Sequence, residues 1–183
     1  MKNIPNILST IRILLVPVFV LVFFSGTENA HAAAALVFLA ASVTDFLDGY
    51  IARRFNFITN LGKILDPAGD KLMTLAMVIC LAIEGTIPGW IPCFFGSKEV
   101  LMAAGGIFIH GRITREMPSS NFLGKTATFV LFCVGVVLML FDVPPAFALG
   151  MIIVTVLLAA AAFISYIVMF AEIWKKHRSK KEN

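Results

Sequence analysis

The chain has few charged residues for its length. Only 14% of its 183 residues are Asp, Glu, Lys or Arg, whereas 59% are hydrophobic. A soluble globular domain has about a quarter charged and about half apolar residues. The composition therefore excludes a soluble globule and predicts a protein that lies largely in lipid.

Cysteine, histidine and long polar segments are also scarce. The 3 Cys lack a metal-ligand spacing such as C-x-x-C, which argues against a zinc site. The connections between apolar runs are too short to hold a soluble domain. We therefore expect a single membrane domain over residues 1–183, with any chemistry carried by residues on the spans or at their ends.

Six apolar runs are long enough to cross a membrane, which takes about 20 residues. They predict an all-α fold, an integral membrane bundle of six transmembrane helices. The expected spans are residues 8–25, 32–52, 61–83, 88–109, 122–141 and 147–173.

Basic residues are distributed unevenly among the ends of these spans. The connections around Glu28, Glu84 and Asp142 contain no Lys or Arg, whereas the other ends are basic and the last 9 residues hold five of the 15 Lys and Arg. Because positive residues stay on the cytoplasmic side, we expect a multi-pass cell-membrane protein with both termini in the cytoplasm. Such a basic tail usually touches anionic membrane lipids, and nucleic acid is not an expected partner.

Four aspartates fall within the apolar runs, near the cytoplasmic side. Asp45 and Asp48 are three residues apart near the end of the second span, and Asp66 and Asp70 are four apart near the start of the third. Each pair therefore shares a helix face. Two antiparallel spans joined by a short loop can bring these faces together at one depth.

Crowded carboxylates repel one another and are costly to bury without compensation. Oxygen ligands with no nearby His or Cys favour hard cations such as Mg²⁺, Mn²⁺ or Ca²⁺. The four aspartates therefore predict two divalent ions of this class, which can bridge a diphosphate. Two other interpretations stay open, namely structural ion pairs with nearby Arg and Lys, and a divalent metal-ion transporter that uses the carboxylates as its path.

The first residues of the chain offer polar groups at the same cytoplasmic end. Pro5 and its polar neighbours suit a helix start at the membrane interface. Asn6 and Arg12 are candidates for contact with a phosphate. The alternative is an interfacial segment that only leads into the first span.

The residues between the two aspartate pairs complete a longer motif. The full string reads Asp45-x2-Asp48-Gly49-x2-Ala52-Arg53-x8-Gly62-x3-Asp66-x3-Asp70. It resembles the complete signature of the CDP-alcohol phosphatidyltransferases, with no position departing from it. The six-span layout with cytoplasmic termini is similar to that family too, so the resemblance covers nearly the whole chain.

This resemblance implies a membrane enzyme that moves a phosphatidyl group from CDP-diacylglycerol to an alcohol and releases CMP. It implies that the four aspartates hold two divalent ions, Mg²⁺ or Mn²⁺, on the diphosphate, and that Asp70 is also the general base. It implies a CDP pocket lined by Gly49, Ala52, Arg53 and Gly62. Because the family is typically homodimeric, a homodimer is the expected assembly.

The motif implies the donor, whereas the acceptor alcohol differs between the two branches of the family that this sequence resembles. Residues 3–9, Arg12 and the stretch 48–54 resemble the bacterial phosphatidylglycerophosphate synthases of this family, which implies glycerol 3-phosphate as acceptor. Lys98 departs from the Arg that this branch generally has at the position. The run from Lys98 to Lys125 resembles instead the single-domain cardiolipin synthases, whose acceptor is phosphatidylglycerol.

An anionic acceptor needs cations beyond the metal ions. Lys98 has an alternative role in a buried structural ion pair with Glu99, and the basic residues of the next cytoplasmic loop have an alternative role in setting topology. The candidate acceptor-binding residues are Lys98, Arg112, Arg115 and Lys125.

Overall fold

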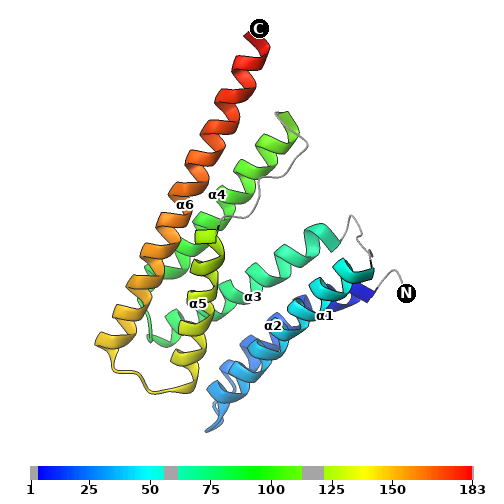
Figure 1. Cartoon of the computed structure of the whole chain (residues 1–183). Coiled ribbons are helices and arrows are strands. Elements are labelled where there is room, and N and C mark those ends of the chain that lie inside the picture. The colour runs from blue at the N-terminus through cyan, green and yellow to red at the C-terminus, as the bar shows by residue number, and fades with distance from the viewer. Residues whose placement is uncertain (1–3, 56–61, 113–121, 183) are drawn as a thin grey trace. The chain divides into compact units, whose positions relative to one another are not determined.

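The computed structural model describes the backbone of residues 4–55, 62–112 and 122–182, and the side chains of residues 10–44, 69–107 and 122–175. The described backbone forms six helices (Figure 1). Within these residues the all-α prediction is confirmed. The helices are α1 (Ile4–Phe23), α2 (Ala30–Phe55), α3 (Gly62–Glu84), α4 (Trp90–Arg112), α5 (Phe122–Leu140) and α6 (Pro145–Glu182).

Two of these helices are long and apolar enough to cross a membrane. They are α5 and residues 145–175 of α6. Among the described residues, α1 and α2 carry shorter apolar segments, Thr10–Phe23 and Ala30–Thr44. These findings agree with a helical membrane bundle, while the number of spans and the side of the termini stay predictions.

The last helix is longer than its apolar run predicts. Helix α6 continues beyond residue 173 to Glu182, through the basic tail. Lys, Arg and Glu are good helix formers, and the tail contains no Pro or Gly that would end the helix. The tail therefore extends the last predicted span as a helix.

A local sequence signal explains where α3 ends. Gly85 follows α3 with φ of 90°, a left-handed conformation that favours glycine. The Thr86 N–H donates to the Leu81 carbonyl at 3.0 Å, and the Gly85 N–H donates to the Ala82 carbonyl at 3.2 Å. These two bonds form a Schellman motif, which ends α3 and turns the chain toward α4.

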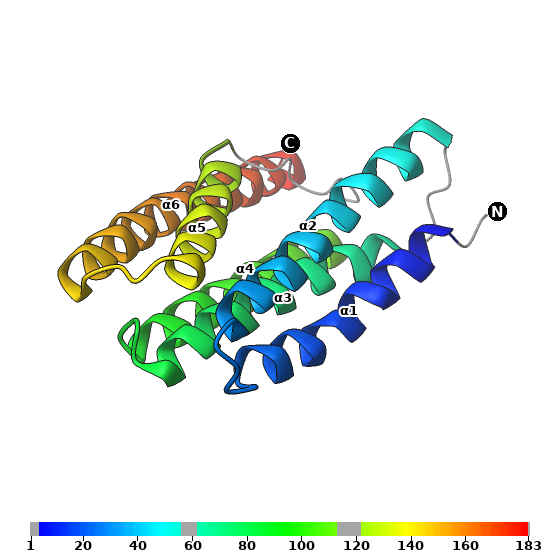
Figure 2. The ribbon, with the colours of Figure 1, turned by 90° about the horizontal axis from the view of Figure 1, so that it is seen from below.

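The chain divides into two compact units, of which the first contains α1, α2, α3 and residues 135–142. In this unit α1 packs against both α2 and α3, which touch each other much less. The N-terminal ends of α1 and α3 lie beside the C-terminal end of α2 (Figure 1, Figure 2). The helix ends that carry the aspartates therefore meet at one end of this unit.

Small residues on α2 let the first three helices approach closely. Ala34, Ala35 and Ala41 are completely buried. On the same helix Phe38 packs against Phe19 of α1, with ring centroids 6.0 Å apart. Close packing around small residues is the usual way in which helices associate in lipid. This packing fixes how deep each residue of α1 lies relative to those of α2.

The second unit contains α4, residues 122–134 of α5, and α6. One stripe of α6 is buried, and its members recur at alternating intervals of 4 and 3 residues, which keeps them on one helix face. These residues are Ala148, Ile152, Thr155, Ala159 and Ala162.

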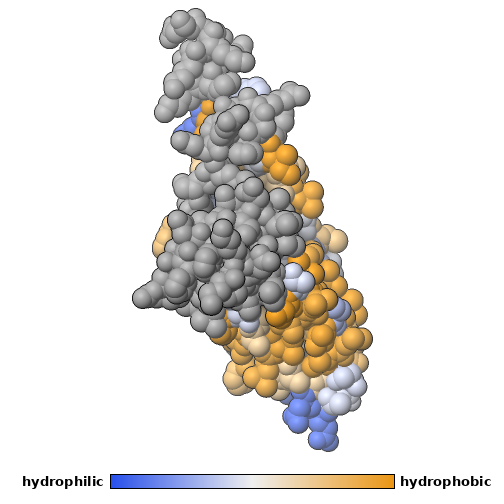
Figure 3. Space-filling model, turned by 90° about the vertical axis from the view of Figure 1, so that its right-hand side faces the viewer, coloured by the Kyte–Doolittle hydropathy of each residue, from blue (hydrophilic) through white to orange (hydrophobic). Residues whose placement is uncertain are grey.

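Large apolar side chains are exposed over much of the described surface. Leu21, Ile107 and Phe122 are 73%, 74% and 79% exposed. The coloured part of the face in Figure 3 is mostly apolar. Soluble proteins rarely expose contiguous apolar surface on a large scale, whereas lipid tails are as apolar as these side chains. The surface therefore supports membrane localisation.

Two adjacent glycines of α4 offer a matched test of packing in the second unit. A Cβ on Gly105 would lie 2.8 Å from the Phe170 ring of α6, whereas a Cβ on Gly106 would meet nothing within 4 Å. Both Gly→Ala changes gain about 1 kcal/mol of helix propensity, but only Gly105→Ala must displace the ring, at about 1–3 kcal/mol. We expect Gly105→Ala to melt at a lower temperature in detergent than Gly106→Ala. Equal melting temperatures would contradict this α4–α6 contact.

Candidate functional site

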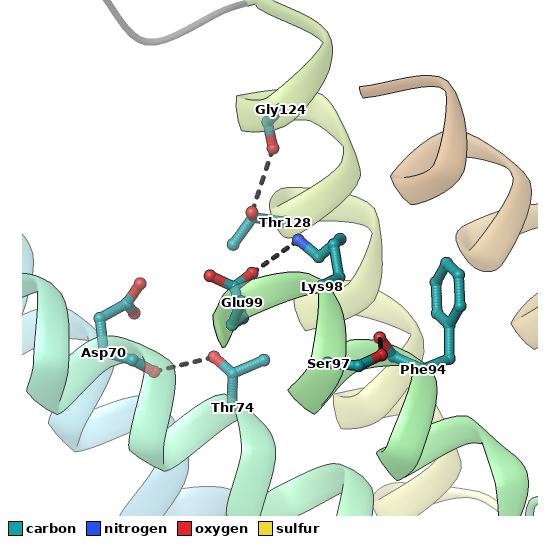
Figure 4. A network of polar contacts seen from close by, with 8 residues as sticks. All are labelled: Asp70, Thr74, Phe94, Ser97, Lys98, Glu99, Gly124 and Thr128. Carbon is teal, nitrogen blue, oxygen red and sulfur yellow. Dashed lines mark hydrogen bonds and ion pairs between the residues drawn. The ribbon is translucent and has the colours of Figure 1, made fainter. Parts of the chain in front are cut away.

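Asp70 is the motif aspartate whose side chain the structure describes. It lies in the third turn of α3 and is half-buried. Its backbone carbonyl accepts a hydrogen bond of 3.0 Å from the Thr74 hydroxyl, while its carboxylate points away from that bond (Figure 4). The bond to Thr74 therefore engages the backbone of Asp70 and not its carboxylate oxygens.

The other three aspartates lie on helical backbone, Asp45 and Asp48 on α2 and Asp66 on α3, and their side chains are outside the described part of the chain. Because both segments are helical, each pair shares a helix face. At a rise of about 1.5 Å per residue, Asp48 lies about 10 Å inside the C-terminal end of α2, and Asp70 about 12 Å inside the N-terminal end of α3. The backbone thus brings the two segments to one end of the first unit at similar depth.

The donor chemistry at this end suits hard divalent cations, because carboxylate oxygens are the ligands that Mg²⁺ and Mn²⁺ prefer. Within the described side chains, no three His, Cys, Asp or Glu groups gather into a metal site. Three of the four motif carboxylates are not among those side chains. The metal ligands stay a prediction that rests on residue type and helical placement.

The residues expected around CDP lie at the same helix ends. Gly49, Ala52 and Arg53 are on the last turns of α2, Gly62 is the first residue of α3, and Asn6 is in the first turn of α1. Their side chains are outside the described part of the chain. The three helix ends meet in the first unit (Figure 2), so the backbone gathers these positions beside the aspartate motif.

Lys98 and Glu99 form an ion pair on α4. The Lys98 Nζ lies 2.6 Å from the Glu99 Oε1, and the two side chains are 14% and 26% exposed (Figure 4). An ion pair with Glu99 is the alternative role that the sequence predicts for Lys98, and this ion pair is present. A phosphate that binds Lys98 would have to share this ammonium group with Glu99.

The remaining acceptor candidates flank the connection between α4 and α5. Arg112 is the last residue of α4, and its side chain is outside the described part of the chain. Lys125 is exposed in the first turn of α5. Arg115 lies outside the described residues. The structure therefore places two of these three positions at the ends of one connection and does not test their roles.

Arg12 is more deeply buried than the sequence indicates. Only 1% of the residue is exposed, although it is a charged residue within an apolar helix. A charge inside an apolar run is a recognised signal of function, so the sequence marks Arg12 as unusual. The sequence alone does not show that neighbouring helices enclose it.

A second polar contact lies at the opposite end of the first unit. The His31 Nε2 lies 2.7 Å from the Glu84 Oε1, and the Thr86 hydroxyl donates to the Glu84 Oε2 at 3.1 Å. The His31–Glu84 pair joins the start of α2 to the end of α3, far along the helices from the aspartate motif, while the Thr86 bond is local to the end of α3. Because His31 and Glu84 are 45% and 32% exposed, such a pair contributes about 0–1 kcal/mol.

Together the helices, the apolar surface and the acidic helix ends define a membrane protein with a candidate cation-binding site. Residues 2–174 match the family model described as CDP-alcohol phosphatidyltransferase. Since this match covers most of the chain, the protein belongs to the CDP-alcohol phosphatidyltransferase family.

Similar proteins carry two names within this family. A Bacillus subtilis (strain 168) protein named CDP-diacylglycerol–glycerol-3-phosphate 3-phosphatidyltransferase is 35% identical over 156 residues, covering 79% of this chain and 80% of that protein. A Rickettsia typhi (strain ATCC VR-144 / Wilmington) protein of the same name is 37% identical over 130 residues, covering 71% and 72%. A Streptomyces coelicolor (strain ATCC BAA-471 / A3(2) / M145) protein named cardiolipin synthase (CMP-forming) is 38% identical over 145 residues, covering 76% and 66%. These names favour a transferase over the metal-ion transporter.

Proposed function

We propose that this protein transfers the phosphatidyl group of CDP-diacylglycerol to glycerol 3-phosphate, giving phosphatidylglycerophosphate and CMP. The observation that carries the proposal is the aspartate motif on α2 and α3 of a chain that belongs to the CDP-alcohol phosphatidyltransferase family. The names of the Bacillus subtilis and Rickettsia typhi relatives support glycerol 3-phosphate as the acceptor.

The proposed enzyme is one multi-pass domain over residues 1–183 in the cell membrane, with six spans and both termini in the cytoplasm. The uneven distribution of Lys and Arg supports this orientation. A site at the cytoplasmic helix ends lets the acyl chains of the donor stay in lipid while glycerol 3-phosphate arrives from the cytoplasm. A homodimer is the proposed assembly, as the resemblance to the family implies.

In the proposed reaction, a hydroxyl oxygen of the acceptor attacks the phosphorus atom that carries diacylglycerol. The bond from this phosphorus to the CMP phosphate oxygen breaks, CMP leaves with the electron pair, and the hydroxyl proton moves to the Asp70 carboxylate. Two Mg²⁺ or Mn²⁺ ions held by Asp45, Asp48, Asp66 and Asp70 would neutralise charge on the diphosphate. Transfer of this kind depends mainly on positioning and charge stabilisation.

Residues beside the aspartates are proposed to hold the nucleotide. Gly49, Ala52 and Gly62 have little or no side chain, which leaves room for CDP close to the helix backbone. Arg53 supplies a guanidinium group, which pairs well with phosphate oxygens. Asn6 reaches this end from α1 and is proposed as a further polar contact.

The acceptor phosphate is proposed to bind basic residues of the second unit, with Lys98 as the first candidate. An ammonium group on an apolar helix is costly unless it is paired or lines a polar cavity. Lys98 is paired with Glu99, which restrains the position of its ammonium group. Arg112, Arg115 and Lys125 are the further proposed contacts.

Phosphatidylglycerol is a second candidate acceptor. The Streptomyces coelicolor relative named cardiolipin synthase is 38% identical to this chain, but the match covers 66% of that protein, against 80% and 72% of the two relatives named for glycerol 3-phosphate. With phosphatidylglycerol as acceptor, the same chemistry would yield cardiolipin and CMP.

The acceptor is tested by CMP release from CDP-diacylglycerol by the purified protein with Mg²⁺. Glycerol 3-phosphate, phosphatidylglycerol, serine and inositol phosphate are supplied in turn. We expect release with glycerol 3-phosphate alone. Release with phosphatidylglycerol alone would make the protein a cardiolipin synthase, and the absence of release with all four would contradict the proposed transfer.

Asp70→Asn is expected to lower the rate of CMP release by about 100-fold or more, because an amide neither accepts the hydroxyl proton nor carries a negative charge. Thr74→Val is a matched control one turn along α3, since the Thr74 hydroxyl is bonded to the Asp70 carbonyl. We expect this control to keep the rate within about twofold of the wild type. A fully active Asp70→Asn protein would contradict the assignment of the base.

Lys98→Met is expected to raise the KM for glycerol 3-phosphate by about tenfold or more, because a charge-assisted bond to phosphate is lost. The KM for CDP-diacylglycerol should stay within about twofold of the wild type. Glu99→Gln is the matched variant, because it removes the partner charge and keeps Lys98. A lower melting temperature in both variants with unchanged KM values would assign the ion pair to structure instead.

A further inference from the structure

Arg12 lies inside the first unit, on the helix that packs against both α2 and α3. It is among the largest fully buried side chains of the described residues. Its Cγ and Cδ atoms pack against Gly69 of α3, where an added Cβ would lie 3.8 and 3.5 Å from them. Gly69 directly precedes Asp70. Helix α1 therefore packs the aliphatic part of Arg12 against the residue that precedes the proposed base.

The depth of Arg12 matches that of the aspartate motif. Arg12 comes eight residues after Ile4 at the start of α1, and Asp70 comes eight residues after Gly62 at the start of α3. Both are therefore about 12 Å inside their helices. Since the N-terminal ends of α1 and α3 lie together (Figure 1, Figure 2), Arg12 and Asp70 lie at the same level.

The acidic residues of the first unit fall into two groups by position. Glu28, Glu84 and Asp142 lie at or just beyond the C-terminal ends of α1, α3 and α5. The other group is the four motif aspartates. A guanidinium group enclosed by apolar helices must be compensated by negative charge. Within the first unit, the acidic residues at the level of Arg12 are those of the motif.

The burial of Arg12 also indicates how it acts. A side chain that binds a nucleotide or a glycerol phosphate has to be reachable when that ligand is absent, yet Arg12 is only 1% exposed. This favours an action through the carboxylates over the direct phosphate contact considered from the sequence.

We propose that Arg12 is a positioning residue, whose guanidinium group orients carboxylates of the aspartate motif for the divalent metal ions. The inference rests on the proposed function, because it takes these aspartates as metal ligands. A guanidinium group presents five N–H donors in a fixed planar fork, which suits the orientation of carboxylate oxygens. Partners of this kind typically contribute about 10–100-fold to metal affinity or activity.

The test measures Mn²⁺ binding to the full-length protein in detergent, without substrate, by isothermal titration calorimetry. Arg12→Met removes the charge and the donors while keeping an unbranched side chain, and is expected to weaken Mn²⁺ binding by about 10–100-fold. Arg12→Lys keeps the charge without the fork and is expected to recover only part of the loss. His31→Gln, at the opposite end of the same unit, is the control and is expected to bind Mn²⁺ like the wild type.

Asp70→Asn in the same titration separates this inference from the proposed function. Weakened binding in Asp70→Asn together with unchanged binding in a folded Arg12→Met protein would overturn the role of Arg12 alone. Unchanged binding in Asp70→Asn would overturn the metal site and the role of Arg12 with it. If Arg12→Met does not elute as a single species, Arg12→Lys decides, because wild-type Mn²⁺ affinity in that variant would overturn the need for the guanidinium fork.

Discussion

The cost of placing charge among apolar helices is the constraint on which this structure depends. Water solvates a carboxylate freely, whereas an apolar helix bundle must replace that solvation with cations, hydrogen bonds or both. The chain has few charges to place, and it concentrates four of its 11 acidic residues on the facing ends of two helices. Such a concentration is sustained only where positive charge is at hand, from metal ions, from the substrate site or from the chain itself.

Close helix packing also determines where the charged groups that compensate one another lie. The alanines of α2 allow the first three helices to approach, and the large side chain of Arg12 is enclosed among them and packs against Gly69 of α3. In lipid this packing is driven by contact and by polar bonds rather than by the hydrophobic effect. The positions of the charged groups are therefore set by the smallest residues around them.

The same constraint is consistent with the chemistry of the family. A phosphatidyl donor has acyl chains that belong in lipid and a diphosphate that requires cations. A bundle whose apolar flanks match lipid, and whose motif aspartates lie at one set of helix ends, offers both environments within a few helical turns. Under the proposed function, basic groups outside the aspartate motif recognise the acceptor, and Lys98 with its partner Glu99 is the first pair to test for acceptor specificity.

The sequence by itself determined the helical class, the approximate helix positions, the aspartate motif and the family. These features can be predicted from local patterns, because apolar runs indicate the helices and residue spacing identifies the motif. Local patterns also account for the turn at Gly85. Hydropathy predicted that the last span ends at residue 173, but the helix continues to Glu182 because the basic tail itself consists of good helix formers.

Only the tertiary structure decided that Arg12 is enclosed, that Lys98 is held by Glu99, and that His31 joins Glu84 across two helices. These three contacts depend on the packing of helix faces and on the side-chain rotamers that this packing permits. The spacing of residues along one helix encodes neither the packing nor the rotamers.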